Sequence, residues 1–208
     1  MAYLLMAEVC LGGIGHDRYR SDVWLLILTI LGAIVVVVVT RGDPRELSRI
    51  RLRGTWLLFV GLGIQIVLEF VEIPKSQIDT IGYALLMAAY AFILAFCFVN
   101  LPTPGIKLIT VGIALNALVI ALNQGMPTEP VGNNAQGRRV REPIERSVKH
   151  RPASSNDLLG FLGDKIVLPE PFDEVISVGD VVVALGVWQL VYAGSRRRRR
   201  RGQNRKRA

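Results

Sequence analysis

Five long apolar runs, separated by short charged or proline-rich breaks, constrain the fold of this chain more than any other feature. Each has 17 to 19 residues, and they occupy 23–39, 56–73, 81–99, 106–122 and 175–193. At 1.5 Å per helical residue, such a run can cross a hydrocarbon core of about 30 Å. A lipid core offers no water to pair with backbone groups, so the runs must be helices. The sequence therefore predicts an all-α, polytopic transmembrane helical bundle of about five spans.

The polar segments around these runs define the domain organisation. We expect a flexible external N-terminal tail over 1–22 and a five-span membrane domain over 23–194. One long loop, 123–174, is expected on the outside, and an Arg-rich tail, 195–208, in the cytoplasm. The other breaks are too short to hold a second folded domain.

Basic residues are concentrated on one predicted face of the membrane. Five arginines within 41–53, Lys107, and nine basic residues in the C-terminal tail make fifteen there. Outside the long loop, the opposite face has only Lys75, Arg18 and Arg20. Positive residues mark the cytoplasmic side, and long loops translocate largely regardless of charge. The chain is thus expected to be a multi-pass protein of the bacterial inner membrane, with its N-terminus outside and its C-terminus in the cytoplasm.

The partners expected from composition are lipids. The spans require a bilayer, and the arginines of the tail are expected to contact anionic lipid headgroups. No aromatic residue is interleaved with these arginines, and no recognition fold accompanies them, so nucleic-acid binding is not expected.

The external loop divides into two parts. Residues 128–157 are rich in Pro, Asn, Arg and Ser, a composition typical of disorder. Residues 158–171 are more apolar and predict a short helical turn, a break at Gly163 and a short extended piece. Such an apolar segment is expected to pack on the outer face of the bundle.

Several spans place polar residues in the same outer leaflet. Gln65, Glu69 and Glu72 follow one helical face of the second run, and Asn116 and Asp180 lie near the outer ends of the fourth and fifth. Polar groups in a membrane are costly and are functional hypotheses by default. The candidate ligand-binding residues are Gln65, Glu69, Asn116, Asp164 and Asp180.

Each candidate also has a purely structural interpretation. Glu69 and Glu72 could reach the outer interface, and Asn116 could hydrogen-bond a neighbouring helix. The sequence from Ser177 to Asp180 fits a capping box that starts the last helix. Asp164, after a glycine, could close a turn.

A set of residues spread over the apolar runs and the loop carries a family resemblance. They are Leu52, Arg53, Gly54, Trp56, Leu57, Leu58, Gln65, Asn116, Ala117, Asn123, Gly125, Met126, Pro127, Leu162, Gly163, Asp164, Leu168, Pro169, Pro171, Ser177, Val178, Gly179, Asp180 and Gly186. With these residues the chain resembles an uncharacterised family of actinobacterial multi-pass membrane proteins, known only as a domain of unknown function. The resemblance implies a membrane location and a helical bundle, and no activity. Val167 stands where the family usually has proline.

Three functions remain open. The first is a non-enzymatic membrane protein that binds a lipid, ion or partner through an outward-facing polar pocket, with 158–171 as its lid. The second is an intramembrane hydrolase in which Asp164 and Asp180 activate water. The third is a scaffold with basic cytoplasmic surfaces. No catalytic arrangement, metal ligand set or cofactor motif is evident, so the sequence favours a protein that is not an enzyme.

Overall fold

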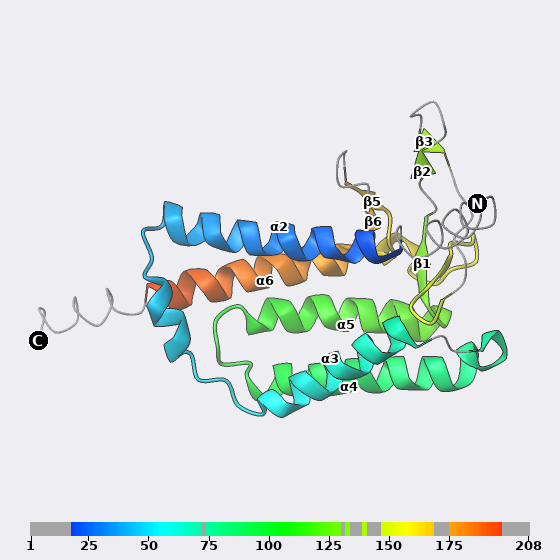
Figure 1. Cartoon of the computed structure of the whole chain (residues 1–208), viewed down its shortest axis with the longest axis horizontal. Coiled ribbons are helices and arrows are strands. Elements are labelled where there is room, and N and C mark those ends of the chain that lie inside the picture. Colours follow the sequence, from blue (N-terminus) through cyan, green and yellow to red (C-terminus); the bar gives the residue numbers. More distant parts are fainter. Residues whose placement is uncertain are drawn as a thin grey trace, which may run out of the picture.

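The computed structural model describes residues 18–71, 74–129, 132–133, 139–140, 147–168 and 175–196. In this part of the chain, five α-helices run side by side (Figure 1). They are α2 (Arg18–Val39), α3 (Thr55–Phe70), α4 (Tyr83–Val99), α5 (Ile106–Asn123) and α6 (Val178–Ser195). Along the bundle, α2 packs on α6, α6 on α5, α5 on α4, and α4 on α3. The expected helical bundle is present.

Three of the helical segments are long and apolar enough to cross a membrane: Ile78–Val99, Ile106–Asn123 and Val178–Ser195. The first includes one π-helical segment, η3 (Ile78–Gly82), which continues into α4. In the described part of the other two helices, the apolar stretches are shorter, Leu25–Val39 and Thr55–Leu68. Length and composition thus give three candidate spans rather than five.

Two predicted runs are not helical over their whole length. In the run at 56–73, the helix α3 ends at Phe70. Val71 is extended, and Pro74, which cannot continue a helix, follows three residues after Val71. The run that begins at residue 175 starts as a strand, and its helix begins only after Ser177, which caps it. Local features, an extended residue before a proline at the end of α3 and a cap at the start of α6, therefore override hydropathy.

The outward surfaces of α2 and α3 are apolar. Val39 is 75% exposed, Phe59 71% and Phe70 70%, and most of their large apolar neighbours on these two helices are exposed as well. The buried core lies instead between α4 and α5, around Tyr90, Val119 and Ile120. Such extensive exposed apolar surface is unfavourable in water and favourable in lipid. Both the apolar composition of the helices and their exposed apolar side chains indicate a membrane environment.

Glycines set the spacing of α5 and α6. A Cβ atom on Gly112 would lie 2.5 Å from the carbonyl oxygen of Gly179. About one turn closer to the start of α5, a Cβ on Gly186 would lie 2.7 Å from the backbone nitrogen of Ile109. Only residues without a side chain allow backbones to approach this closely. We call this contact the α5–α6 seam.

The described parts of the predicted basic segments lie at one end of the bundle. Residues 41–53, which we call the arginine arch, contain the 3₁₀ helix η1 (Pro44–Arg49) and connect α2 to α3 across the C-terminal end of α6 (Figure 1). The backbone N–H of Asp43 donates to the carbonyl of Ser195 at 3.0 Å. The α4–α5 turn, with Lys107 after it, lies at this end too, since Asn100 hydrogen-bonds the backbone of Arg53.

The opposite end carries a small folded cap made from the long loop. Strand β1 (Met126–Thr128) pairs in parallel with β4 (His150–Pro152), and β5 (Ile166–Val167) pairs antiparallel with β6 (Val175–Ile176). The remaining pair is β2 (Gly132–Asn133) with β3 (Arg139–Val140). The 3₁₀ helix η4 (Gly160–Leu162) precedes β5.

The cap confirms one sequence prediction and corrects another. The helical turn, the glycine break and the extended piece predicted for 158–171 are present as η4, Gly163 and β5. The disorder predicted for 128–157 is wrong for 128–129 and 147–157. These residues are ordered because β1 and β4 pair and because Arg151 forms an ion pair with Asp157. Residues 130–131, 134–138 and 141–146 lie outside the described residues.

Candidate functional site

The strongest polar cluster lies between α5 and α6 near the cap. Asn116 Nδ2 donates to Asp180 Oδ1 at 2.8 Å. The Ser177 hydroxyl lies 2.7 Å from Asp180 Oδ2 and 3.0 Å from Asn116 Oδ1, so its single proton is shared between two acceptors. The structure thus joins two of the predicted site residues directly, at the point where the seam is tightest.

Ser177 and Asp180 also form the predicted capping box, which is confirmed. The Asp180 N–H donates to Ser177 Oγ at 3.1 Å, and the Ser177 N–H donates to Asp180 Oδ2 at 2.9 Å. This exchange satisfies backbone donors that would otherwise be unpaired at the start of α6. Both carboxylate oxygens of Asp180 are therefore hydrogen-bonded: Oδ1 to Asn116 of α5, and Oδ2 to Ser177 at the start of α6.

Asp164 occupies a different position, inside the cap. It is 5% exposed, and its Oδ2 atom accepts a hydrogen bond from the Thr128 hydroxyl at 2.9 Å. His150 Nε2 lies 3.5 Å from the same oxygen. The backbone pairs as well: the Asp164 N–H donates to Pro127 O at 3.0 Å, and the Glu129 N–H donates to Asp164 O at 3.0 Å. Asp164 therefore joins β1 and β4 to the segment that leads into β5.

Of the predicted residues on α3, Gln65 makes no hydrogen bond with the described residues of either cluster. Gln65 is partly buried and lies one turn after Gly61, which packs on Ala89 and Ile93 of α4. Its position on α3 places it toward α4 rather than at the α5–α6 seam. The side chain of Glu69, and all of Glu72, fall outside the described residues.

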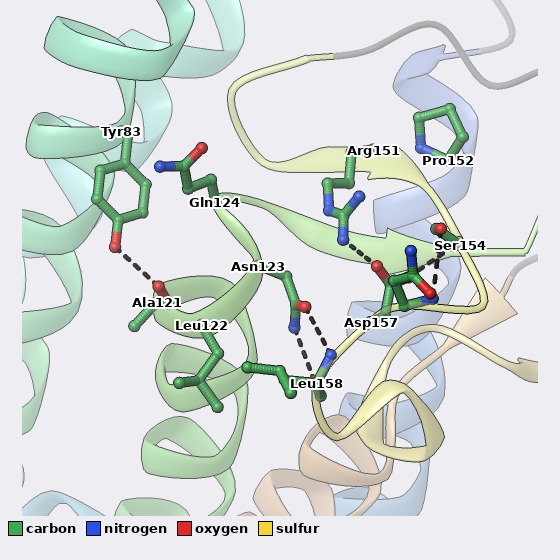
Figure 2. Close-up of a pocket in the computed structure, with 11 residues that line it drawn as sticks. Tyr83, Ala121, Leu122, Asn123, Gln124, Arg151, Pro152, Ser154, Asp157 and Leu158 are labelled. Atoms are coloured by element: carbon green, nitrogen blue, oxygen red, sulfur yellow. Dashed lines mark hydrogen bonds and ion pairs between the residues drawn. The ribbon is translucent and has the colours of Figure 1, made fainter.

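An open pocket lies at the cap end, where the start of α4 and the end of α5 meet the loop (Figure 2). Its volume is about 720 Å³. It is lined by apolar and polar side chains from three segments of the chain: Tyr83, Ala121, Leu122, Asn123, Gln124, Arg151, Pro152, Ser154, Asn156, Asp157 and Leu158. None of the five predicted site residues is among them.

Hydrogen bonds fix the walls of this pocket. Asn123 bonds both backbone groups of Leu158: its Nδ2 donates to the carbonyl at 2.8 Å, and its Oδ1 accepts from the N–H at 2.9 Å. The Tyr83 hydroxyl donates to Ala121 O at 3.2 Å, which ties α4 to the end of α5. Arg151 points toward Asp157 and pairs with it (Figure 2). Among the described residues, the buried Nε of Arg151 has no hydrogen-bond acceptor.

Sequence reasoning did not select the residues of this pocket. Arg151 and Asp157 lie in the segment expected to be disordered, and Asn123 was noted only as part of a family resemblance. A usable signal was present in the loop: an arginine and an aspartate six residues apart, flanked by Pro152 and Ser154, are compatible with an ordered, ion-paired turn.

The chemistry available at the cap end is that of hydrogen bonding and of ion pairs, Arg151 with Asp157 and Lys165 with Glu129. Asp164 and Asp180 bond different neighbours, so the contacts of the described residues do not make them a carboxylate pair. Across the described part of the chain, no three His, Cys, Asp or Glu side chains gather as metal ligands would.

Comparison with known proteins gives one match. Residues 49–192, well over half of the 208 residues, match a family of unknown function, DUF5317. No curated protein and no solved structure matches the chain. The matched range runs from the arginine arch to the end of α6 and includes both polar clusters and the pocket. The chain belongs to this family of unknown function.

Proposed function

We propose that this chain is a non-enzymatic, five-span integral membrane protein of the bacterial inner membrane that binds a polar ligand at its outer face. The membrane domain would cover 23–194, between an external tail, 1–22, and a cytoplasmic tail, 195–208. The arginine arch and the C-terminal tail would face the cytoplasm, and the cap would face outward. Resemblance to actinobacterial multi-pass proteins agrees with this placement.

The arginines gathered at one end of the bundle and the exposed apolar surface along its helices together support five spans. The described apolar stretches of α2 and α3 are shorter than those of the other three helices, but many large apolar side chains of α2 and α3 are exposed. A helix whose apolar stretch is short can still span where the bilayer thins locally or flanking residues reach the interface. Trp56, at the start of α3 and 62% exposed, is the kind of residue that occupies that interface.

The observation that carries the binding function is the open pocket between the helix ends and the ordered part of the loop. Asn123, Gln124 and Asn156 supply amide groups, while Leu122 and Leu158 supply apolar contacts. The opposite charges of the one ion pair that lines it largely cancel. Such a lining suits a neutral ligand with hydroxyl or amide groups, such as a lipid headgroup at the outer interface.

The predicted site residues would stabilise the helices and the cap around this pocket without lining it. Asn116 and Asp180 hold α5 against α6, and Asp164 holds the cap in its fold. Gln65 and Glu69 would extend the polar surface along α3. An aspartate-dependent hydrolase has less support, because the recorded hydrogen bonds of Asp164 and Asp180 serve the fold.

Native mass spectrometry of the gently solubilised protein tests the proposal. A double variant, Gln124→Ala with Asn156→Ala, should lose a bound mass that the wild type retains. Gln77→Ala, an exposed residue outside the pocket, is the matched control and should keep it. If the bound mass disappears in Glu69→Gln but persists in the double variant, the ligand lies along α3 and not in this pocket. A wild type without any bound mass would count against the binding function.

A further inference from the structure

We infer that the arginine arch is a preformed binding site for the phosphate groups of anionic phospholipids, independent of the C-terminal tail. The inference rests on the membrane placement proposed above and does not involve the pocket at the cap. Its partner is identified by two features that occur together: cationic side chains on a fixed backbone and exposed apolar surface directly beside them.

The backbone of the arch is fixed at its α2 end. The Gly42 N–H donates to Val37 O at 2.9 Å and the Arg41 N–H donates to Val38 O at 3.1 Å, with Arg41 in the left-handed region at φ 50°. These are the two bonds of a Schellman motif, which ends a helix at a defined position. Asp43 then caps η1 by accepting from the Arg45 N–H at 3.0 Å.

Contacts with other helices hold the middle and the far end. Leu47 and Ile50 pack on Gly194 near the end of α6, where an added Cβ would lie 2.7 Å from each side chain. Asn100 Oδ1 accepts from the Arg53 N–H at 2.8 Å, and Asn100 Nδ2 donates to Arg53 O at 2.8 Å. The arch is therefore tied to α2, α6 and α4, so its arginines project from a backbone that needs little ordering on binding.

The charge at this end is strongly positive and uncompensated. The described residues there include seven basic side chains and two acidic ones; the basic ones are Arg41, Arg45, Arg49, Arg51, Arg53, Lys107 and Arg196. Both acidic groups are engaged within the arch, since Asp43 caps η1 and the buried Glu46 pairs with Arg49 at 3.1 Å. Arg45, Arg51 and Arg53 are exposed. Exposed guanidinium groups are suited to bind phosphate oxygens.

Apolar side chains flank the arginines on the helices that the arch connects. Val38 and Val39 at the end of α2 are 68% and 75% exposed, and Trp56 lies three residues after Arg53. Phe98 and Val99 at the end of α4 are also exposed. A phospholipid matches this pattern, with its phosphate at the guanidinium groups and its acyl chains along the helices. A nucleic acid or a soluble anion would leave the apolar part uncovered.

Trp56 provides a local probe. In a Trp24→Phe, Trp188→Phe background it is the one remaining tryptophan of the chain. The protein is reconstituted in bilayers containing brominated phosphatidylglycerol or brominated phosphatidylcholine, and bromine quenches a tryptophan in contact with its acyl chain. Two arginines, at about 1 kcal/mol each near the surface, correspond to a preference of roughly thirtyfold for the anionic lipid. We expect a preference of at least about tenfold that falls to nearly one in Arg51→Gln with Arg53→Gln.

The controls separate the arch from other causes. Deletion of 197–208 removes the tail, and Lys165→Gln removes a charge at the cap end; both should leave the preference at Trp56 unchanged. A preference lost with the tail and retained in the arginine variant would overturn the inference. Equal quenching by both lipids in the parent would overturn it as well, and no quenching by either lipid would contradict the membrane placement itself.

A second measurement covers the case in which the tryptophan background does not fold. Native mass spectrometry of the otherwise wild-type protein, released from mixed bilayers, should show phosphatidylglycerol adducts that are reduced in Arg45→Gln with Arg51→Gln. Adducts of equal abundance in that variant would again contradict the inference.

Discussion

Asn116 Nδ2 donates a hydrogen bond to Asp180 Oδ1 at 2.8 Å, and this bond crosses the α5–α6 seam. The two residues are 64 positions apart, and the whole cap is formed by the chain between them. The bond therefore closes the loop that carries the cap. It also places a partly buried carboxylate beside an amide, where a second carboxylate would be strongly unfavourable.

Two substitutions of Asn116 should distinguish the effect of losing the hydrogen bond to Asp180 from the effect of adding a like charge beside it. Asn116→Ala leaves Asp180 Oδ1 without its partner, so we expect a loss of about 1–3 kcal/mol in the free energy of unfolding. Asn116→Asp should cost more at neutral pH, because it places like charges at hydrogen-bond distance. Unfolding by sodium dodecyl sulfate in mixed micelles measures both, with the exposed Gln77→Ala as control. Equal stability of all three variants would show that the bond is dispensable.

Glycines in and out of the seam should respond in opposite directions. In Gly112→Ala the new methyl group would meet Gly179 O and Val183 of α6, and we expect a loss of about 1–3 kcal/mol. Gly63 of α3 has nothing within 4 Å of an added Cβ, so Gly63→Ala should be neutral or stabilise the helix by about 0.5–1 kcal/mol. The same micelle titration compares them. Loss of stability in Gly63→Ala would indicate that the space around Gly63 is more crowded than in this structure.

Asp164→Asn should loosen the cap and leave the bundle intact. The substitution weakens the bond from Thr128 and removes a charge next to His150, while the α5–α6 seam is untouched. Hydrogen exchange should become faster in β1 and β4, and in the helices it should stay as in the wild type. Glu129→Gln is the matched control, because the Glu129–Lys165 pair at 3.3 Å is partly exposed and contributes little. Faster exchange throughout the bundle would contradict a role confined to the cap.

The sequence could predict what depends on neighbouring residues. Apolar runs predicted the helices, and the spacing of Ser177 and Asp180 predicted the capping box, because both features are local. The turn at η4 and the extended β5 were also readable from a few residues. The grouping of the basic segments at one end followed from the alternating direction of successive helices.

Long-range pairing could not be predicted in the same way. Composition alone made residues 147–157 look disordered, but β4 pairs with β1, which lies 24 positions earlier, and Asp157 finds Arg151. The polar residues of three runs were expected to share one site because they share one leaflet. Depth along a helix does not fix the direction in which a side chain points: Asn116 faces α6, whereas Gln65 lies one turn from Gly61, which packs on α4.

The membrane placement predicts which ends of the bundle are accessible from outside the cell. Ser155, exposed in the cap, and Ser48, exposed in the arginine arch, are suitable positions for single cysteines. In a Cys10→Ser background the remaining Cys97 is 1% exposed and should not react. A membrane-impermeant maleimide should label Ser155→Cys in intact cells and Ser48→Cys only after the membrane is opened. Labelling of Ser48→Cys but not of Ser155→Cys in intact cells would place the arch outside and reverse the orientation. Three helices, α3, α4 and α5, lie between the two positions and would put them on opposite sides if all three span. Labelling of both positions in intact cells would therefore show that α3, which has the shortest apolar stretch of the three, does not span as proposed.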